Sequence, residues 1–268
     1  MIGLFDSGVG GLTVVREVMR RLPGVSLVYF GDTARTPYGN KSPEVVARYG
    51  VEAARFLIGK GADILVIACN TVSSVGLEAI KQEFPHVPVF DVIKPAVKAI
   101  AERAGSQKTK VRNNCVGVMG TRALVGSGIY QKLLKEINGF KVVTQAAPLL
   151  VPLVEENWLN APETKRVVKR YLTPFKQAQV GTLVLACTHY PLLKKIISSR
   201  VGKKIKIIDP AEETAKELFN WLKVNPSVEK NLKKGESIFY VSDITPHTQD
   251  IADKWLGKKV TLEKIVLE

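Results

Sequence analysis

The chain repeats one short pattern, first as Ala62-Asp63-Ile64-Leu65-Val66-Ile67-Ala68-Cys69-Asn70-Thr71 and later as Val180-Gly181-Thr182-Leu183-Val184-Leu185-Ala186-Cys187-Thr188-His189. Each copy is an apolar run followed by Ala-Cys and by polar residues that suit the start of a helix. The repetition predicts two related half-structures, each presenting a thiol at the end of a buried strand. Two such thiols could approach one carbon atom from opposite sides. A reaction that takes a proton from one face and returns it to the other needs such a pair.

Strand and helix patterns alternate along most of the chain. Strands are expected at residues 2–6, 26–30, 63–69, 88–92, 115–119, 140–144, 182–187, 205–208, 237–241 and 260–267. Helices are expected at 12–22, 43–59, 72–84, from 95, and at 123–137, 151–157, 163–177, 192–201 and 209–222. Short apolar strands alternating with helices are typical of parallel sheets covered on both faces, with all carboxyl ends of the strands on one edge.

These elements predict an α/β protein of two similar lobes, each a mostly parallel sheet flanked by helices, with the active site in the cleft between them. We expect residues 1–94 and 209–268 to form the first lobe, which carries Cys69, and residues 95–208 to form the second, which carries Cys187. The polar and basic stretch 105–114 predicts a surface loop.

Composition limits the class of protein. The 268 residues are 46% hydrophobic and 24% charged, as in an ordinary globular protein, and no stretch is long and apolar enough to span a bilayer. The N-terminus opens without the features of an export signal. Three cysteines, an odd number, favour free thiols in a reducing compartment, so we expect a cytoplasmic protein. Three histidines and no Cys-x-x-Cys pair argue against a metal site.

The formal net charge of +14 allows two interpretations. It could attract anions such as nucleic acid, or it could reflect a lysine-rich solvated surface, as in Lys194-Lys195 and Lys203-Lys204. We favour the solvated surface because no aromatic residues are interleaved with the lysines. The sequence therefore predicts neither an obligatory nucleic-acid partner nor a membrane partner.

Polar residues follow four of the expected strands, and a parallel sheet collects such residues on one edge. They are Asp6-Ser7, Gly31-Asp32-Thr33, Cys69-Asn70-Thr71 and Cys187-Thr188-His189. A free thiol has a pKa of about 8.5, and the helix expected after Cys69 and after Cys187 should lower it. Both thiols could then act as base or as acid near neutral pH. Cys115 begins a strand without polar followers and is expected to be structural.

Two further side chains at this edge have open roles. Asp6 could accept a proton or cap the next helix, and His189 could assist Cys187 or serve as a capping or packing residue. The loop from Gly8 to Gly11 lacks the dinucleotide-binding spacing and the Walker lysine, so we expect it to bring backbone N–H groups close to a carboxylate. No lysine is marked as a Schiff-base former, which predicts chemistry without a cofactor.

Inversion at the α-carbon of an amino acid suits this set of residues. Removal of the weakly acidic α-hydrogen needs a base in contact and donors that stabilise the developing charge, while a second acid waits on the opposite face. Hydroxyl and N–H groups at Ser7, Asn70, Thr71 and Thr188 could hold the carboxylates of a substrate.

Four segments, at residues 5–12, 31–39, 68–71 and 187–192, closely resemble the glutamate racemases of the aspartate/glutamate racemase superfamily. The resemblance implies a cofactor-independent interconversion of L- and D-glutamate that supplies D-glutamate for bacterial peptidoglycan. It implies that Cys69 and Cys187 are the acid/base thiols, assisted by Asp6 and His189. Cys187 would remove the α-proton of L-glutamate, and Cys69 that of D-glutamate. The substrate-binding residues that it implies are Ser7, Tyr38, Gly39, Asn70, Thr71 and Thr188, together with Asp32, Thr121 and Glu155 from less similar stretches.

The sequence departs from the pattern of these racemases at Val72 and Asp91, where alanine and glycine are commoner. The first motif begins at residue 5, so we expect no activation by a cell-wall precursor; a homodimer is compatible with the sequence.

Two alternative functions stay open. One is a racemase of the same superfamily that acts on aspartate or a hydantoin, because few atoms set specificity. The other is a basic α/β module that binds nucleic acid.

Overall fold

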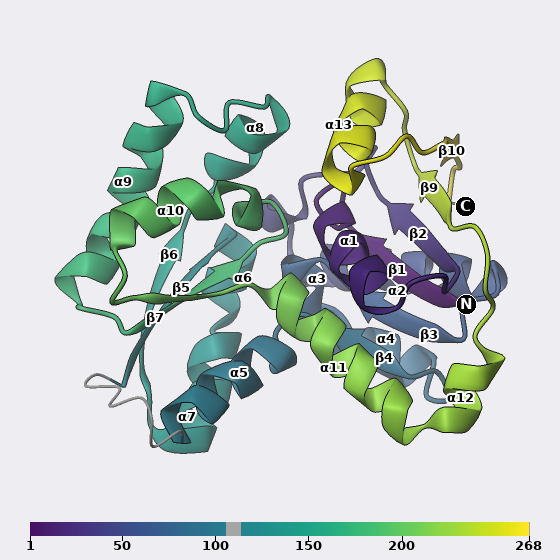
Figure 1. Ribbon diagram of the computed structural model, residues 1–268, viewed down its shortest axis with the longest axis horizontal. Coiled ribbons are helices and arrows are strands. Elements are labelled where there is room, and N and C mark those ends of the chain that lie inside the picture. The colour runs from purple at the N-terminus through teal and green to yellow at the C-terminus, as the bar shows by residue number, and fades with distance from the viewer. Residues whose placement is uncertain (106–113, 268) are drawn as a thin grey trace.

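The computed structural model describes residues 1–105 and 114–267 and contains two parallel sheets (Figure 1). The larger has the strand order β10-β9-β2-β1-β3-β4 and the smaller the order β6-β5-β7-β8. The larger comprises β1 (Ile2–Asp6), β2 (Leu27–Gly31), β3 (Ile64–Ile67), β4 (Val89–Asp91), β9 (Ile238–Val241) and β10 (Leu262–Lys264). The smaller comprises β5 (Cys115–Gly120), β6 (Lys141–Ala146), β7 (Thr182–Ala186) and β8 (Lys206–Ile208). The expected α/β fold with two sheet-based lobes is confirmed.

Helices cover both sheets (Figure 1). Those of the first lobe are α1 (Leu12–Arg21), α2 (Pro43–Gly59), α3 (Asn70–Val75), α4 (Leu77–Glu83), α11 (Pro210–Val224), α12 (Pro226–Asn231) and α13 (Pro246–Leu256). Those of the second are α5 (Lys94–Gly105), α6 (Arg122–Ser127), α7 (Ile129–Asn138), α8 (Leu150–Glu155), α9 (Pro162–Gln177) and α10 (Lys194–Val201). Two 3-10 helices, η1 (Tyr38–Asn40) and η2 (Tyr190–Leu193), follow strand ends. None of these helices combines the length and apolarity needed to cross a membrane.

Strand β1 shows how both faces of the larger sheet become buried. Alternate side chains point to opposite faces of a strand, so Leu4 belongs to the hydrophobic cluster that includes Val14 of α1, and Phe5 to the cluster that includes Leu57 of α2. Full burial of one such side chain stabilises the fold by about 1.5–3 kcal/mol. The cluster on the α1 side also includes Leu172 of α9, so the two lobes share a continuous apolar core.

Capping residues explain where several helices begin. Ser42 accepts a hydrogen bond from the backbone N–H of Val45 and precedes Pro43 at the first position of α2, as the sequence predicts. Asp209 does the same for α11 by accepting from the backbone N–H of Ala211. Both signals are local, so they are readable in the sequence.

Two expected helices are each two helices in the structure. The helix expected at 72–84 is interrupted at Gly76, and the one expected at 123–137 is interrupted at Gly128, whose φ of 65° lies in the left-handed region. Helices α12 and α13 were not expected. Thr245, which caps α13, with Pro246 and the following Gly257, is a start-and-stop signal that could have revealed α13. Most of the surface loop expected at 105–114 lies outside the described residues.

Candidate active site

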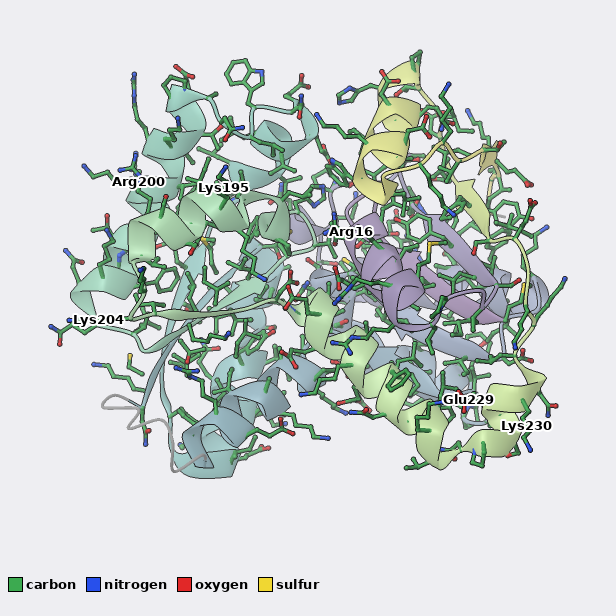
Figure 2. All side chains as sticks on the ribbon, viewed as in Figure 1. Arg16, Lys195, Arg200, Lys204, Glu229 and Lys230 are labelled. Carbon is green, nitrogen blue, oxygen red and sulfur yellow. The ribbon has the colours of Figure 1, made fainter. Side chains whose placement is uncertain are left out.

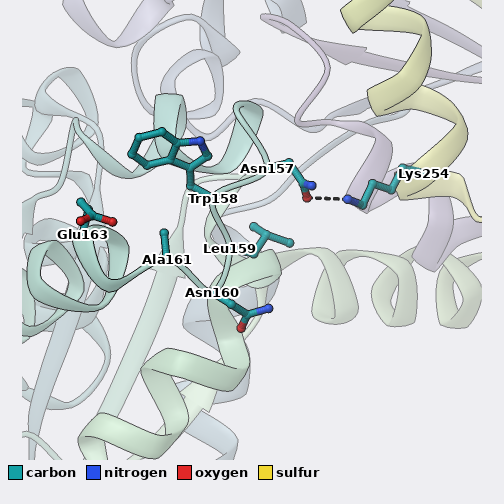
Figure 3. A pocket seen from close by; sticks show the side chains of 7 residues that line it. All are labelled: Asn157, Trp158, Leu159, Asn160, Ala161, Glu163 and Lys254. Atoms are coloured by element: carbon teal, nitrogen blue, oxygen red, sulfur yellow. Dashed lines mark hydrogen bonds between the residues drawn. The ribbon is translucent and has the colours of Figure 1, made fainter.

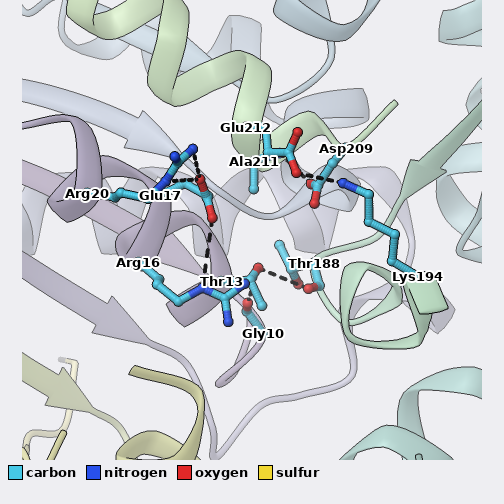
Figure 4. A network of polar contacts seen from close by, with 10 residues as sticks. All are labelled: Gly10, Thr13, Arg16, Glu17, Arg20, Thr188, Lys194, Asp209, Ala211 and Glu212. Atoms are coloured by element: carbon cyan, nitrogen blue, oxygen red, sulfur yellow. Dashed lines mark hydrogen bonds and ion pairs between the residues drawn. The ribbon is translucent and has the colours of Figure 1, made fainter. Parts of the chain in front are cut away.

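The loops at the carboxyl ends of the two sheets contact one another. The hydroxyl of Thr13, at the start of α1, donates to the backbone carbonyl of Thr188 beyond β7, with a separation of 3.0 Å (Figure 4). The hydroxyl oxygens of Thr71 and Thr121 lie 2.9 Å apart and share a hydrogen bond across the lobes. Thr71 and Thr188, two of the polar residues expected at separate strand ends, therefore each contact the opposite lobe.

Cys69 is the thiol of the first lobe. It caps α3 just beyond β3, is 5% exposed, and donates from Sγ to the hydroxyl of Ser7 at 3.2 Å. Burial and the nearby carboxylate of Asp6 raise the pKa of Cys69 to about 12, although Ser7 and the backbone N–H groups of Val72 and Thr71 oppose this rise. The backbone N–H groups at the helix start do lower the pKa of Cys69, but burial outweighs them, so the expected net lowering is wrong.

Asp6 ends β1 and lies within electrostatic reach of both Cys69 and His189. It is 2% exposed, and burial raises its pKa, although His189 and backbone N–H groups oppose the rise. Its Oδ2 accepts from the backbone N–H of Gly8, while its Oδ1 is buried without a hydrogen-bond partner among the described residues. Asn70 likewise has a buried Oδ1 with no partner in this part of the chain. Two unpaired buried acceptors suit a ligand that brings N–H donors, such as an ammonium group.

Cys187 is the thiol of the second lobe. It follows β7, is 6% exposed, and its Sγ lies 3.8 Å from Nδ1 of His189. The Nε2 atom of His189 lies 2.9 Å from Oε1 of Glu155 on α8. Burial alone would lower the pKa of His189, but the hydrogen bonds to Cys187 and Glu155 outweigh burial and raise it to about 10. A protonated His189 therefore places a positive charge beside Sγ of Cys187.

A tryptophan from the first lobe completes the surroundings of His189. The ring of Trp255 on α13 meets the His189 ring edge-on, with the centroids 5.5 Å apart and the planes at 89°. The neighbouring residue, Lys254, donates to the side chain of Asn157 at the end of α8 (Figure 3). Sequence reasoning missed Trp255 because it missed α13.

Gly10 lies in the loop that the sequence assigns to the site, but its close approach to the second lobe was not expected. A Cβ atom added at Gly10 would lie 2.2 Å from Oγ1 of Thr188 and 2.5 Å from Cε1 of His189. At Gly39, an added Cβ would lie 2.9 Å from the Cβ of Thr121. Both glycines stand where one lobe approaches the other, so the lack of a side chain at each permits close packing of the two lobes.

Asp32 lies behind Tyr38 at the end of β2. The Asp32 carboxylate is fully buried and accepts from Nε of Arg35 at 2.6 Å, from the hydroxyl of Ser242 at 2.7 Å and from the hydroxyl of Tyr38. The Tyr38 ring also packs against Phe5, with 6.3 Å between centroids. Both carboxylate oxygens of Asp32 therefore accept hydrogen bonds from protein groups, and the carboxylate fixes the position of the Tyr38 hydroxyl.

We expect Asp32→Asn to destabilise the protein by about 2–4 kcal/mol, because Arg35 loses its buried counter-charge and a donor is left without an acceptor. Tyr38→Phe should cost only about 1–2 kcal/mol, because Asp32 keeps its other two donors. Urea unfolding of the two variants beside the unaltered protein measures both values. An Asp32→Asn variant as stable as the unaltered protein would contradict this account.

We expect Glu155→Gln to lower the pKa of His189 from about 10, because the Glu155 carboxylate is one of the two hydrogen-bonding groups that raise it. His189 in the folded state holds its proton above its ordinary pKa of 6.5, so it stabilises the fold most at low pH, and this stabilisation fades as the pH rises from about 6.5 to about 10. NMR titration of the imidazole signals measures the change, with His86 and His247 as internal references. An unchanged His189 titration in the variant would show that Glu155 does not hold the proton there.

The structure brings most of the expected site residues to the junction between the lobes. The connected residues are Asp6, Ser7, Cys69, Thr71 and Gly39 from the first lobe and Thr121, Glu155, Cys187, Thr188 and His189 from the second. Asn70 follows Cys69 at the start of α3, and Tyr38 and Asp32 support the wall of the first lobe. A buried thiol on each lobe, with polar side chains beside it, is an arrangement that suits acid/base chemistry.

Comparison with known proteins agrees with this class of site. The chain belongs to the Asp/Glu/Hydantoin racemase family, which it matches over residues 11–218. Two relatives are the glutamate racemases of Geobacter metallireducens, 42% identical over 97% of this chain and 93% of that protein, and of Aquifex aeolicus, 44% identical over 99% of both. The crystal structure of glutamate racemase from Francisella tularensis in complex with D-glutamate superposes with a TM-score of 0.90 at 33% identity, covering 100% of this chain and 97% of that one.

Proposed function

We propose that the protein interconverts L- and D-glutamate by a two-thiol acid/base mechanism that needs no cofactor. The observation that carries the proposal is the position of Asp6, which lies within electrostatic reach of Cys69 on its own lobe and of His189 on the other, while Nδ1 of His189 lies 3.8 Å from Sγ of Cys187. The relatives of the chain that are named glutamate racemase, and the solved relative in complex with D-glutamate, favour glutamate as the substrate.

The protonation states of the free site favour one direction of proton flow. His189, with a pKa of about 10, is an imidazolium at neutral pH and lies beside Sγ of Cys187, which we assign as the base. Cys69, with a pKa near 12, is a thiol and can donate. Sγ of Cys187 then removes the α-proton from one face of glutamate, and Sγ of Cys69 delivers its proton to the other. On the assignment of thiols that the family resemblance implies, this resting state is ready for L-glutamate.

The reverse direction requires Cys69 to become the base. Burial raises the pKa of Asp6, so its carboxylate can take up a proton from the Cys69 side more readily than an exposed aspartate could. The ammonium group of a bound amino acid beside Asp6 and Cys69 would also favour the thiolate. Asp6 and His189 therefore serve as matched helpers of the two thiols.

We propose that donors from both lobes hold the substrate. Ser7 and Asn70 on the first lobe and Thr188 on the second offer hydroxyl, amide and backbone N–H groups to carboxylate oxygens. The hydrogen-bonded hydroxyls of Thr71 and Thr121 lie across the junction, so a substrate that engages them contacts both lobes at once. We assign Gly39 to the same wall, and we assign Asp32 to the positioning of Tyr38.

The three free cysteines of the chain suit a reducing cytoplasm. D-glutamate made there would supply the peptidoglycan of the bacterial cell wall. We propose this physiological role together with the reaction, because the reaction is the source of the D-enantiomer.

Incubation with L-glutamate in deuterated water tests the reaction. We expect loss of the α-proton signal together with a decay of optical rotation to zero, and at least about 100-fold slower turnover of L-aspartate or a 5-substituted hydantoin. Chiral chromatography of each mixture gives the rates. Faster turnover of aspartate or the hydantoin would move the protein to another branch of the family, and no α-proton exchange with any of the three would refute the racemase assignment.

A further inference from the structure

The positive charge of the protein is concentrated on one part of the second lobe. Residues 162–206 contain eleven lysines and arginines and a single acidic residue, Glu163, so they carry +10 of the net charge of +14. The exposed cations of α9 are Lys165, Arg166, Lys169, Arg170 and Lys176. We call these residues, with Lys195, Arg200 and Lys204 on and after α10, the basic face.

The basic face has no counter-charges of its own. Its eight side chains form no ion pair within the described part of the chain, whereas several cations of the first lobe are paired, as in Arg20 with Glu17 at 2.7 Å and Lys264 with Asp243 at 2.6 Å. Lys165 and Lys169 are four residues apart on α9, as are Arg166 and Arg170. Like charges at this spacing repel and destabilise a helix by about 0.2–0.5 kcal/mol per pair. The face therefore carries a repulsion that an external anion would relieve.

The two helices place these charges on one side of the molecule. Helix α10 packs against α9, and Lys195, Arg200 and Lys204 project along the outer side of the second lobe (Figure 2). On α9, Lys165 and Lys176 are separated by eleven residues, a rise of about 16 Å. This length matches about five successive phosphates on one strand of a nucleic-acid duplex, which are spaced about 3.4 Å apart along the axis.

We propose that the basic face binds the phosphate backbone of duplex nucleic acid without sequence preference. Arginine and lysine that neutralise phosphates release condensed counterions, which is the main source of such binding. Arginines such as Arg166 and Arg170 add bidentate hydrogen bonds to phosphate oxygens. The interaction is separate from the racemisation site, because none of the eight side chains belongs to that site.

The composition of the face favours a duplex over two other anionic partners. Its aromatic residues Tyr171, Phe175 and Tyr190 are buried or half-buried, so they offer no stacking platform for single-stranded bases. No large exposed hydrophobic side chain lies within residues 162–206, so the face lacks the apolar anchor typical of a membrane-surface helix.

Fluorescence anisotropy of a labelled 20-base-pair duplex tests the proposal with the full chain. We expect a Kd in the micromolar range at 50 mM NaCl and a steep loss of affinity by 200 mM. The variant Lys165→Gln/Lys169→Gln/Lys176→Gln should bind at least about tenfold more weakly, with a salt slope shallower by about 2–3. The matched control is Lys230→Gln/Lys233→Gln/Lys234→Gln, which removes three exposed charges from the first lobe and should bind like the unaltered protein within about twofold.

Racemisation of glutamate, measured in parallel, should stay unchanged in both triple variants and so reports that each is folded. No duplex binding by the unaltered protein at 50 mM NaCl would overturn the proposal. Equal weakening of duplex binding in the two triple variants would also overturn it, because the affinity would then depend on the net charge of the protein and not on the basic face. Sedimentation with phosphatidylglycerol vesicles provides the remaining comparison. Vesicle binding as tight as duplex binding, with the same dependence on the α9 lysines, would overturn the choice of nucleic acid.

Discussion

Cys69→Ala and Cys187→Ala are each expected to lower the rate of racemisation by at least about 10⁴-fold, because each removes an acid/base group for which the opposite face offers no substitute. The two variants should differ in the enantiomer whose α-proton they still exchange with solvent. The Cys187→Ala variant keeps the thiol that serves D-glutamate on the family assignment, so it should still exchange the α-proton of D-glutamate with solvent. Cys69→Ala should exchange only that of L-glutamate.

Proton NMR in deuterated water, combined with chiral chromatography, separates exchange from inversion in both variants. Both side chains are small and buried, and replacing sulfur by hydrogen at such a site costs about 1 kcal/mol, so the fold should survive. Cys115→Ala is the matched control: Cys115 is the third buried cysteine, at the start of β5, and the substitution should leave activity intact. Full racemisation by either active-site variant would end the two-thiol mechanism.

Those two cysteines were identifiable because their signal is local. Each stands at the end of an apolar run and before polar residues, and the doubling of this pattern distinguishes Cys69 and Cys187 from Cys115. The alternating fold follows from equally local patterns, such as Ser42-Pro43 at the start of α2. Such features depend on a few neighbouring residues, so the sequence shows them directly.

Contacts between distant segments were not predictable in the same way. Trp255 contacts His189 because the late strand β9 pairs with β2 in the larger sheet, and α13, which follows β9, then lies near the other lobe. No local sequence pattern around residue 255 predicts a contact with residue 189. The sequence therefore identifies residues of the site without identifying the distant residues that contact them.

Electrostatic environments also depend on the assembled fold. The sequence predicts a lowered pKa for Cys69 from the helix that follows it, yet the buried carboxylate of Asp6, 63 residues earlier, helps to raise the pKa to about 12. For His189, burial lowers the pKa and hydrogen bonding raises it, and the contacts with Cys187 and Glu155 together outweigh burial. Protonation states in this site are properties of the junction between the lobes.

Gly10→Ala is expected to reduce racemisation at least about 100-fold, because misplacement of catalytic groups by about 1 Å has effects of this size. The new methyl group would fall 2.2 Å from Oγ1 of Thr188 and 2.5 Å from Cε1 of His189, well inside contact distance. Neither neighbour can yield easily. Thr13 holds the Thr188 carbonyl, and Glu155 holds the His189 ring, so relief requires either an opened junction or a displaced imidazole.

The control is Gly59→Ala at the end of α2, where an added Cβ meets no atom within 4 Å. Alanine is the better helix former by up to about 1 kcal/mol, so this variant should be as stable as the unaltered protein or slightly more so, with full activity. Steady-state rates and urea unfolding of the two variants distinguish a catalytic defect from a folding defect. If Gly10→Ala racemises glutamate as fast as Gly59→Ala does, the close approach of the two lobes at His189 is not needed for turnover.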